Sequence, residues 1–311
     1  MLMTQMLQRI RPQNWRDGLL LILLTLFWGI NWPVMKDAVR ELPPLFFRSI
    51  SMTGGVIALG VWLLCQKGGW RACLMPRQHV GDVVLLAIPN MVIWHLFAIY
   101  GVTLLASGRA AVLGYTMPLW AALAAVWLLR ERLARRHWLG LCAGALGIVL
   151  LLASEWQRLA IAPVGTVFML IAAAAWGLGT VLLRKMPIPV ESTVLTWWML
   201  VITTPCMWLA SIVLEWPGWL WPTGREWVEI LYNALVVFAF CHVVWFRLAR
   251  TLPPVISSLS IMLIPVVGVV AGMLWLGERP HWQDYAALLM LLVALAMVLG
   301  RPATSPASHA S

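Results

Sequence analysis

The tetrapeptide Leu129-Arg130-Glu131-Arg132 returns 147 residues later as Leu276-Gly277-Glu278-Arg279, each time after a long apolar run. At the same offset Pro118 corresponds to Pro265 and His95 to His242. With a one-residue slip, Trp28-Gly29 corresponds to Trp176-Gly177. Self-similarity at a fixed offset indicates that the chain contains two copies of one structural unit.

The composition indicates that these copies lie in a membrane. Of the 311 residues, 62% are hydrophobic and 11% are charged, whereas soluble domains have about 45–50% and about 25%. The mean hydropathy of +0.86 implies more apolar surface than water can solvate. A net charge of +10 would suit nucleic acid, but the basic residues fall in short gaps between apolar runs and indicate topology instead. We expect an all-α membrane protein that contacts the lipid bilayer and no nucleic acid.

Clusters of charge, Pro and Gly separate apolar runs of about 20 residues, the length needed to cross a bilayer. They predict ten spans, at residues 18–38, 44–65, 80–104, 107–129, 137–153, 164–183, 190–214, 229–250, 254–276 and 282–300. Residues 1–17 are expected to be a cytoplasmic segment, and residues 301–311 a disordered cytoplasmic tail. Fifteen Lys and Arg residues lie on one side of the spans and seven on the other. The positive-inside rule therefore places both termini in the cytoplasm.

The spans divide into two copies, residues 18–153 and 164–300, with five spans each. Because five is odd, the second copy enters the bilayer with the opposite orientation. Inverted repeats supply two related conformations around a site near the middle of the membrane, which is typical of secondary transporters.

The chain resembles the EamA-type transporters of the drug/metabolite transporter superfamily from about Asp17 to Gly300. The matching pieces, in order, are Phe27-Trp28-Gly29, Lys36, Pro43-Pro44, Arg48, Pro118, Glu131-Arg132 and Glu278-Arg279. The resemblance implies a multi-pass exporter of small metabolites in the bacterial inner membrane, with a central cavity lined by both halves.

The sequence lacks the motifs of several kinds of catalytic and nucleotide-binding site. It has no paired acids, zinc-binding H-E-x-x-H helix or elbow serine, and no phosphate-binding glycine loop. Its five cysteines show no C-x-x-C spacing. We therefore expect no enzyme, no cofactor and no metal. Residues 25–35 contain no acid, so the carboxylate-driven proton antiport of the superfamily's small multidrug members is not supported.

Polar side chains within spans are candidate functional groups, because hydrocarbon penalises them unless they are paired or face water. His95 and His242 are expected to face each other near the cavity. The alternative is that each is a neutral histidine bonded to a carbonyl. Mid-span aromatic rings would suit amphipathic cargo, although packing explains any single ring as well. The candidate cavity residues are Trp28, Asn31, Trp94, His95, Arg109, Tyr115, Trp176, His242 and Trp245.

Other residues have two interpretations. Arg109 either binds a substrate carboxylate or extends to the outer headgroups. Arg48 is interpreted as structural, paired with an acid in the outer loops. Pro118 and Pro265 are candidate hinges. Gly140-x-x-x-Gly144 serves either a homodimer or packing within a monomer.

The sequence thus predicts an exporter of small amphipathic metabolites, such as amino acids or their derivatives, that works by alternating access. A carrier of phosphorylated or drug-like solutes in the same superfamily is the alternative. An integral membrane enzyme acting on lipids is the less favoured one.

Overall fold

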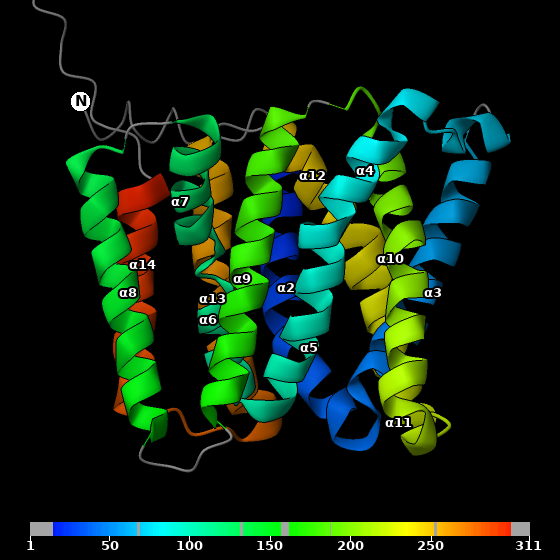
Figure 1. The fold of residues 1–311 in the computed structure, drawn as a ribbon. Helices are drawn as coiled ribbons and strands as arrows, with labels where there is room; N and C mark the ends of the chain where they lie inside the picture. The colour runs from blue at the N-terminus through cyan, green and yellow to red at the C-terminus, as the bar shows by residue number, and fades with distance from the viewer. Residues whose placement is uncertain are drawn as a thin grey trace, which may run out of the picture.

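A computed structural model describes residues 15–66, 69–130, 133–156, 162–186, 188–251 and 254–299. Within these ranges every regular element is helical (Figure 1). The α-helices are α2 (Trp15–Glu41), α3 (Pro44–Leu64), α4 (Val80–Ala87), α5 (Trp94–Leu104), α6 (Ser107–Gly114), α7 (Met117–Leu129), α8 (Arg135–Trp156), α9 (Ala162–Lys185), α10 (Ser192–Glu215), α11 (Gly224–Leu231), α12 (His242–Thr251), α13 (Pro254–Leu276) and α14 (Trp282–Leu299). The tail, most of the N-terminal segment and Glu131-Arg132 lie outside the described residues.

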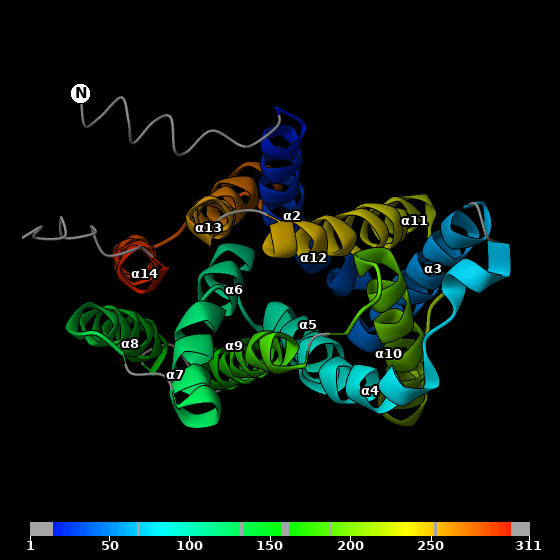
Figure 2. The ribbon, with the colours of Figure 1, turned by 90° about the horizontal axis from the view of Figure 1, so that it is seen from above.

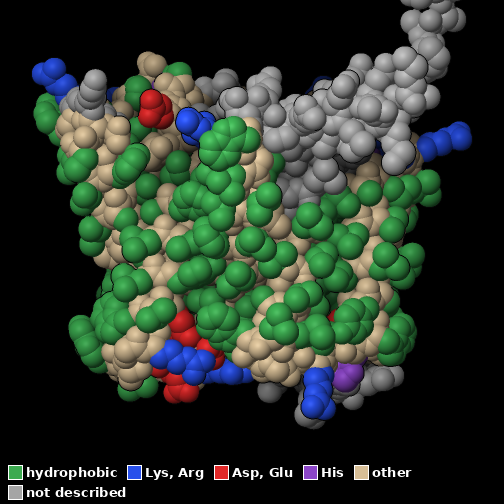
Figure 3. Space-filling model, turned by 180° about the vertical axis from the view of Figure 1, so that it is seen from behind, with side chains coloured by type: hydrophobic (Ala, Val, Ile, Leu, Met, Phe, Trp, Pro, Cys, Tyr) green, Lys and Arg blue, Asp and Glu red, His purple; other side chains and the backbone are tan. Residues whose placement is uncertain are grey.

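The described residues form eight helical segments that are long and apolar enough to cross a membrane. Two further apolar segments, Met262–Leu276 and Trp282–Val298, are shorter. Hydrophobic side chains cover the middle of the face in Figure 3, and charged ones gather at its two ends. The prediction of an all-α membrane protein is confirmed, while the number of ten spans and the cytoplasmic termini remain predictions.

Helices from the two sequence copies interleave rather than form two separate bodies. Seen from above, α8 lies beside α14, α2 beside α13 and α3 beside α10 (Figure 2). The α2–α13 contact has a counterpart in the contact of α9 with α7. Each copy therefore buries its apolar faces mainly against the other copy.

The repeated Trp-Gly pair marks the two close crossings. A Cβ atom added to Gly177 in α9 would lie 2.7 Å from the backbone nitrogen of Ala121 and the carbonyl oxygen of Met117 in α7. A Cβ added to Gly29 in α2 would collide with Val267 in α13. Small residues allow helix backbones to approach closely in membranes.

Three expected spans are divided. Spans three and eight each contain a wider π-helical segment, Ile88–Ile93 and Tyr232–Cys241. Span four stops at Gly114 and restarts at Met117. Pro118 explains the restart, because it has no N–H to donate to the preceding turn and fits the first turn of a helix.

The expectation of equivalent hinge prolines needs correction. Pro118 lies in the first turn of α7 after a break, whereas Pro265 lies inside the continuous helix α13. The two prolines therefore lie in different local structures, and their role as hinges remains a prediction. The dimer interpretation of Gly140-x-x-x-Gly144 is also corrected, because these glycines pack against Ala294 of α14 in the same chain.

We predict that Gly177→Ala lowers the free energy of unfolding by about 1–3 kcal/mol, because the fixed backbone of α7 leaves no room for a methyl group. The midpoint of thermal unfolding in one detergent measures the effect. Gly81→Ala is the matched control, since a Cβ at Gly81 meets nothing within 4 Å. Equal midpoints for the two variants would contradict the close crossing.

Candidate functional site

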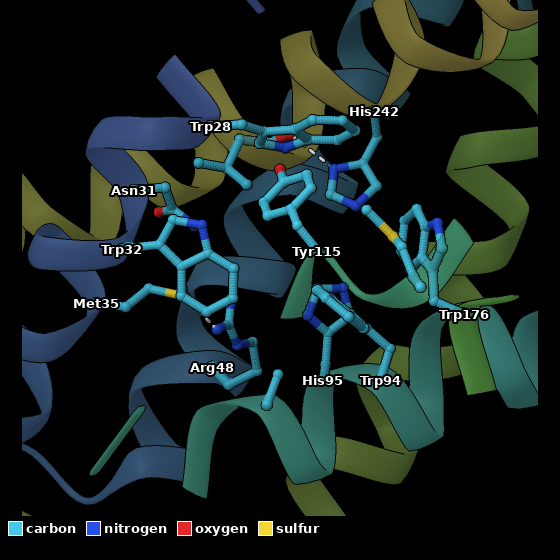
Figure 4. Close-up of a pocket in the computed structure, with 13 residues that line it drawn as sticks. Trp28, Asn31, Trp32, Met35, Arg48, Trp94, His95, Tyr115, Trp176 and His242 are labelled. Carbon is cyan, nitrogen blue, oxygen red and sulfur yellow. Dashed lines mark hydrogen bonds between the residues drawn. The ribbon is translucent and has the colours of Figure 1, made fainter. Parts of the chain in front are cut away.

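A small cavity lies at the centre of the molecule, where both sequence copies contribute side chains (Figure 4). Its volume of about 50 Å³ has room for a few water molecules. The lining residues are Trp28, Asn31, Trp32, Met35, Arg48, Trp94, His95, Ala98, Tyr115, Met117, Trp176, Val237 and His242. The structure thus brings together seven of the nine candidate residues and leaves Arg109 and Trp245 outside.

His95 and His242 lie against each other in this cavity, with ring centroids 6.0 Å apart. His242 follows directly on the π-helical segment Tyr232–Cys241, and His95 follows one residue after the segment Ile88–Ile93. The two histidines thus lie at equivalent places in the two copies. Nδ1 of His242 lies 2.8 Å from the carbonyl oxygen of Val237. Because a carbonyl only accepts, Nδ1 carries the hydrogen and Nε2 is left as an acceptor in the neutral ring.

His95 has a different environment from His242. Its side chain is buried, and neither ring nitrogen has a hydrogen-bond partner among the described residues. The side-chain oxygen of Asn31 is buried and lacks a partner there too. Buried polar atoms are normally paired, so such atoms in a cavity are free to bind a ligand.

Tryptophan rings surround the histidine pair. Trp28 and Trp176 contact the ring of His242 at centroid distances of 5.7 and 6.1 Å, and Trp94 contacts Trp176 at 5.1 Å. The close crossings at Gly29 and Gly177 hold the helices that carry Trp28 and Trp176. The cavity therefore offers aromatic faces together with a few polar atoms, as ligand cavities do.

Arg48 requires a correction. We expected it to pair with an acid in the outer loops, yet it is 1% exposed and lines the central cavity. Its guanidinium contacts Oδ1 of Asn233 at 3.5 Å and Sδ of Met35 at 2.8 Å. Asp37 and Glu229 pair with Arg225 instead. The guanidinium is thus directed into the cavity rather than toward the outer loops.

Arg109 is not a cavity residue. Its Nε donates to Oδ1 of Asp284 at 2.7 Å, and it lines a separate pocket beside Glu278 and His281. The nearby carboxylate explains this placement, because a partly buried guanidinium gains most from a charge partner. Trp245 lies just outside the cavity, with its ring 5.9 Å from that of Trp28.

Sequence reasoning missed Trp32 and Met35. Both lie on the same face of α2 as Trp28, four and seven residues further along. Residues spaced by three, four and seven share one face of a helix. The spacing of these residues in the sequence could therefore have identified them as cavity residues.

Charged residues gather at the end of the molecule at which α11 begins, the lower end in Figure 1. Asp37 is buried and pairs with Arg225 and, at 3.5 Å, with Arg40, and it accepts a hydrogen bond from Nε1 of Trp275 at 3.1 Å. Glu229 pairs with Arg225 as well. We call these residues the Asp37 cluster.

Three further charges join helix ends at the same end of the molecule. Glu278 accepts from the N–H groups of Ser107 and Gly108, and Glu215 from those of Leu45 and Phe46. Lys36 donates to the carbonyls of Val102 and Thr103, the last of which lies near the end of α5. Carboxylates suit helix N-termini and cations suit C-termini.

The opposite end is hollow. A pocket of about 310 Å³ is lined by His137 and Arg184 as well as by Met117 and Trp176. The last two also line the central cavity. The upper pocket and the central cavity therefore adjoin, whereas the residues of the Asp37 cluster do not line the central cavity.

Comparison with known proteins decides the family. Residues 17–153 and 163–300 each match the EamA-like transporter family. The chain belongs to this family. It is 25% identical to the uncharacterized transporter YoaV of Bacillus subtilis, covering 83% of this chain and 88% of YoaV. It is 22% identical to a Salmonella typhimurium protein named "Probable amino-acid metabolite efflux pump", covering 90% and 93%.

A solved crystal structure with 20% sequence identity has the same fold, with a TM-score of 0.66 over 92% of this chain and 96% of the other. The EamA-like family and the transporter names of the relatives agree with the expectation that the chain is not an enzyme. The chain is a multi-pass membrane protein of a transporter family.

We predict that Asp37→Asn opens the lower end, because the buried carboxylate of Asp37 is the acceptor on which Arg225, Arg40 and Trp275 converge. The thiol introduced by Ala98→Cys, in a chain whose five native cysteines are replaced by alanine, should react with maleimide at least about tenfold faster. Asp82→Asn is the matched control, since the carboxylate of Asp82 is exposed and pairs with His79 outside the cluster. Unchanged labelling in Asp37→Asn would refute a closing role for the cluster.

Proposed function

We propose that the chain is a secondary transporter that exports small amphipathic metabolites across the bacterial inner membrane by alternating access. One observation carries the proposal, namely that Trp28 and His95 of the first copy meet Trp176 and His242 of the second in one buried cavity. A site shared by inverted repeats can face either side of the membrane when the repeats rock against each other. Amino acids or their derivatives are the first candidate cargo, supported by the name of the Salmonella relative.

The proposed units are residues 18–153 and 164–300, with both termini in the cytoplasm. The charge asymmetry of fifteen against seven Lys and Arg residues supports this orientation. The lower end, with the Asp37 cluster, then faces the periplasm, and the pocket beside His137 and Arg184 faces the cytoplasm. In this orientation the pocket beside His137 and Arg184 would accept cargo from the cytoplasm, as an exporter requires.

A carrier of phosphorylated solutes is the second candidate, and the cavity favours it less. A phosphate with two negative charges is usually bound by several cationic groups. Among the lining residues Arg48 alone carries a permanent positive charge. The cavity itself gives no indication of a partner protein, so the working unit is proposed to be a monomer, with a homodimer as the alternative.

Flux tests the proposal. Proteoliposomes that contain the purified protein should release labelled aromatic or aliphatic amino acids faster than protein-free vesicles. Release at the protein-free rate for every amino acid would reject them as cargo. Comparing flux with and without a pH gradient determines whether protons are coupled.

We predict that replacing both His95 and His242 by alanine lowers the flux about tenfold or more, because each ring offers a hydrogen bond inside the cavity. The amount of protein in the membrane should stay unchanged. His79→Ala is the control, since His79 pairs with Asp82 away from the cavity. Normal flux in the double variant would exclude the histidines from the transport cavity.

The orientation makes a separate prediction. A reporter enzyme fused after Ser311 should be active only when the reporter is one that works in the cytoplasm. Activity of a periplasm-specific reporter at this position would overturn the topology.

A further inference from the structure

Arg48 is a buried cation without a carboxylate partner among the described residues. Its side chain is almost completely inaccessible, and it lies in a segment expected to cross the membrane. Among the described residues it contacts the amide oxygen of Asn233, the sulfur of Met35 and the faces of two phenylalanine rings, Phe47 and Phe238. These groups hold the guanidinium in place, but none of them neutralises its charge.

An uncompensated charge inside a membrane protein is costly and normally marks a binding site or a transport path. We propose that the cargo carries a carboxylate and that Arg48 binds it. This inference rests on the proposed function, because it concerns the ligand of the same cavity. A carboxylate would supply the missing negative charge and accept the N–H groups of the guanidinium fork.

Unused hydrogen-bonding atoms support this site. Nε of Arg48 is buried and has no partner in the described part of the chain, and the same holds for both ring nitrogens of His95. Both residues line the cavity, and Figure 4 draws them at the same side of it. A carboxylate oxygen beside Arg48 could therefore also accept an N–H from His95.

Aromatic rings line the remainder of the cavity. Trp28, Trp94 and Trp176 present rings toward it, and no lining residue, all of which are described, carries a carboxylate. A cationic amine would meet the charge of Arg48 with no opposite charge beside it. The cavity thus selects acids over amines by repulsion as well as by attraction.

Three ligands with one carbon skeleton test the proposal on the wild-type protein. They are 3-phenylpropionate, L-phenylalanine and phenethylamine, which differ in charge. Calorimetric titration into the protein in lipid nanodiscs measures binding without any need for transport. We expect both carboxylates to bind at least about tenfold more tightly than phenethylamine, the effect of one charge-assisted contact. Equal or tighter binding of phenethylamine, or no binding of all three, would overturn the proposal.

Variants test whether Arg48 causes the preference for carboxylates over phenethylamine. Arg48→Met should remove the difference between 3-phenylpropionate and phenethylamine, and Arg48→Lys should keep part of it because the positive charge remains. Arg71→Met, at an exposed arginine outside the cavity, is the matched control and should change nothing. A preference that survives intact in folded Arg48→Met would show that Arg48 is only structural. If Arg48→Met does not fold, Arg48→Lys decides, and an unchanged ratio there would contradict the bidentate role.

The binding and flux experiments test the two proposals independently, so one proposal can be rejected while the other stands. Tight binding of the carboxylates without flux would reject the transporter proposal and keep the carboxylate site. Flux of phenethylamine that equals flux of 3-phenylpropionate would keep the transporter and reject the site.

Discussion

Hydrocarbon cannot hydrogen-bond, so every polar group within it needs a protein partner or a water-filled space. This constraint explains why several buried polar side chains gather at one place. Its long helices satisfy their own backbone and present apolar surfaces to the outside. Arg48, His95 and Asn31, which have unsatisfied polar atoms among the described residues, line one cavity where both sequence copies meet. Because the copies interleave, this cavity lies between elements that belong to different copies.

The same constraint accounts for the lower end of the molecule. Helix termini leave N–H and C=O groups unpaired, and here Glu278, Glu215 and Lys36 bind such groups on other helices. The Asp37 cluster lies at the same end. Glu229 of that cluster precedes Asn233 by one helical turn, and Asn233 contacts Arg48. The Asp37 cluster and the cavity are thus connected through one helical segment, Gly224–Leu248.

Much of this arrangement could be predicted from the sequence, because hydropathy fixes where helices cross and a repeat offset fixes which residues are equivalent. The placement of His95 beside His242 followed from the offset alone. Arg109 and Arg48 could not be placed, because both lie near span ends and only the packing decides which one meets a carboxylate. Asp284 holds Arg109, whereas α3 directs Arg48 inward. The break before Pro118 and the π-helical turns were missed for a similar reason, since hydropathy is continuous across them.

The central claim is that cargo binds between the two copies, and locating a bound ligand tests it most directly. A crystal structure of the protein with 3-(4-iodophenyl)propionate would give an anomalous signal at the iodine atom. The account predicts a peak among Trp28, Trp176 and Tyr115, with the carboxylate toward Arg48. A peak instead in the separate pocket lined by Ala58, Leu235 and Val243, with the central cavity empty, would contradict it.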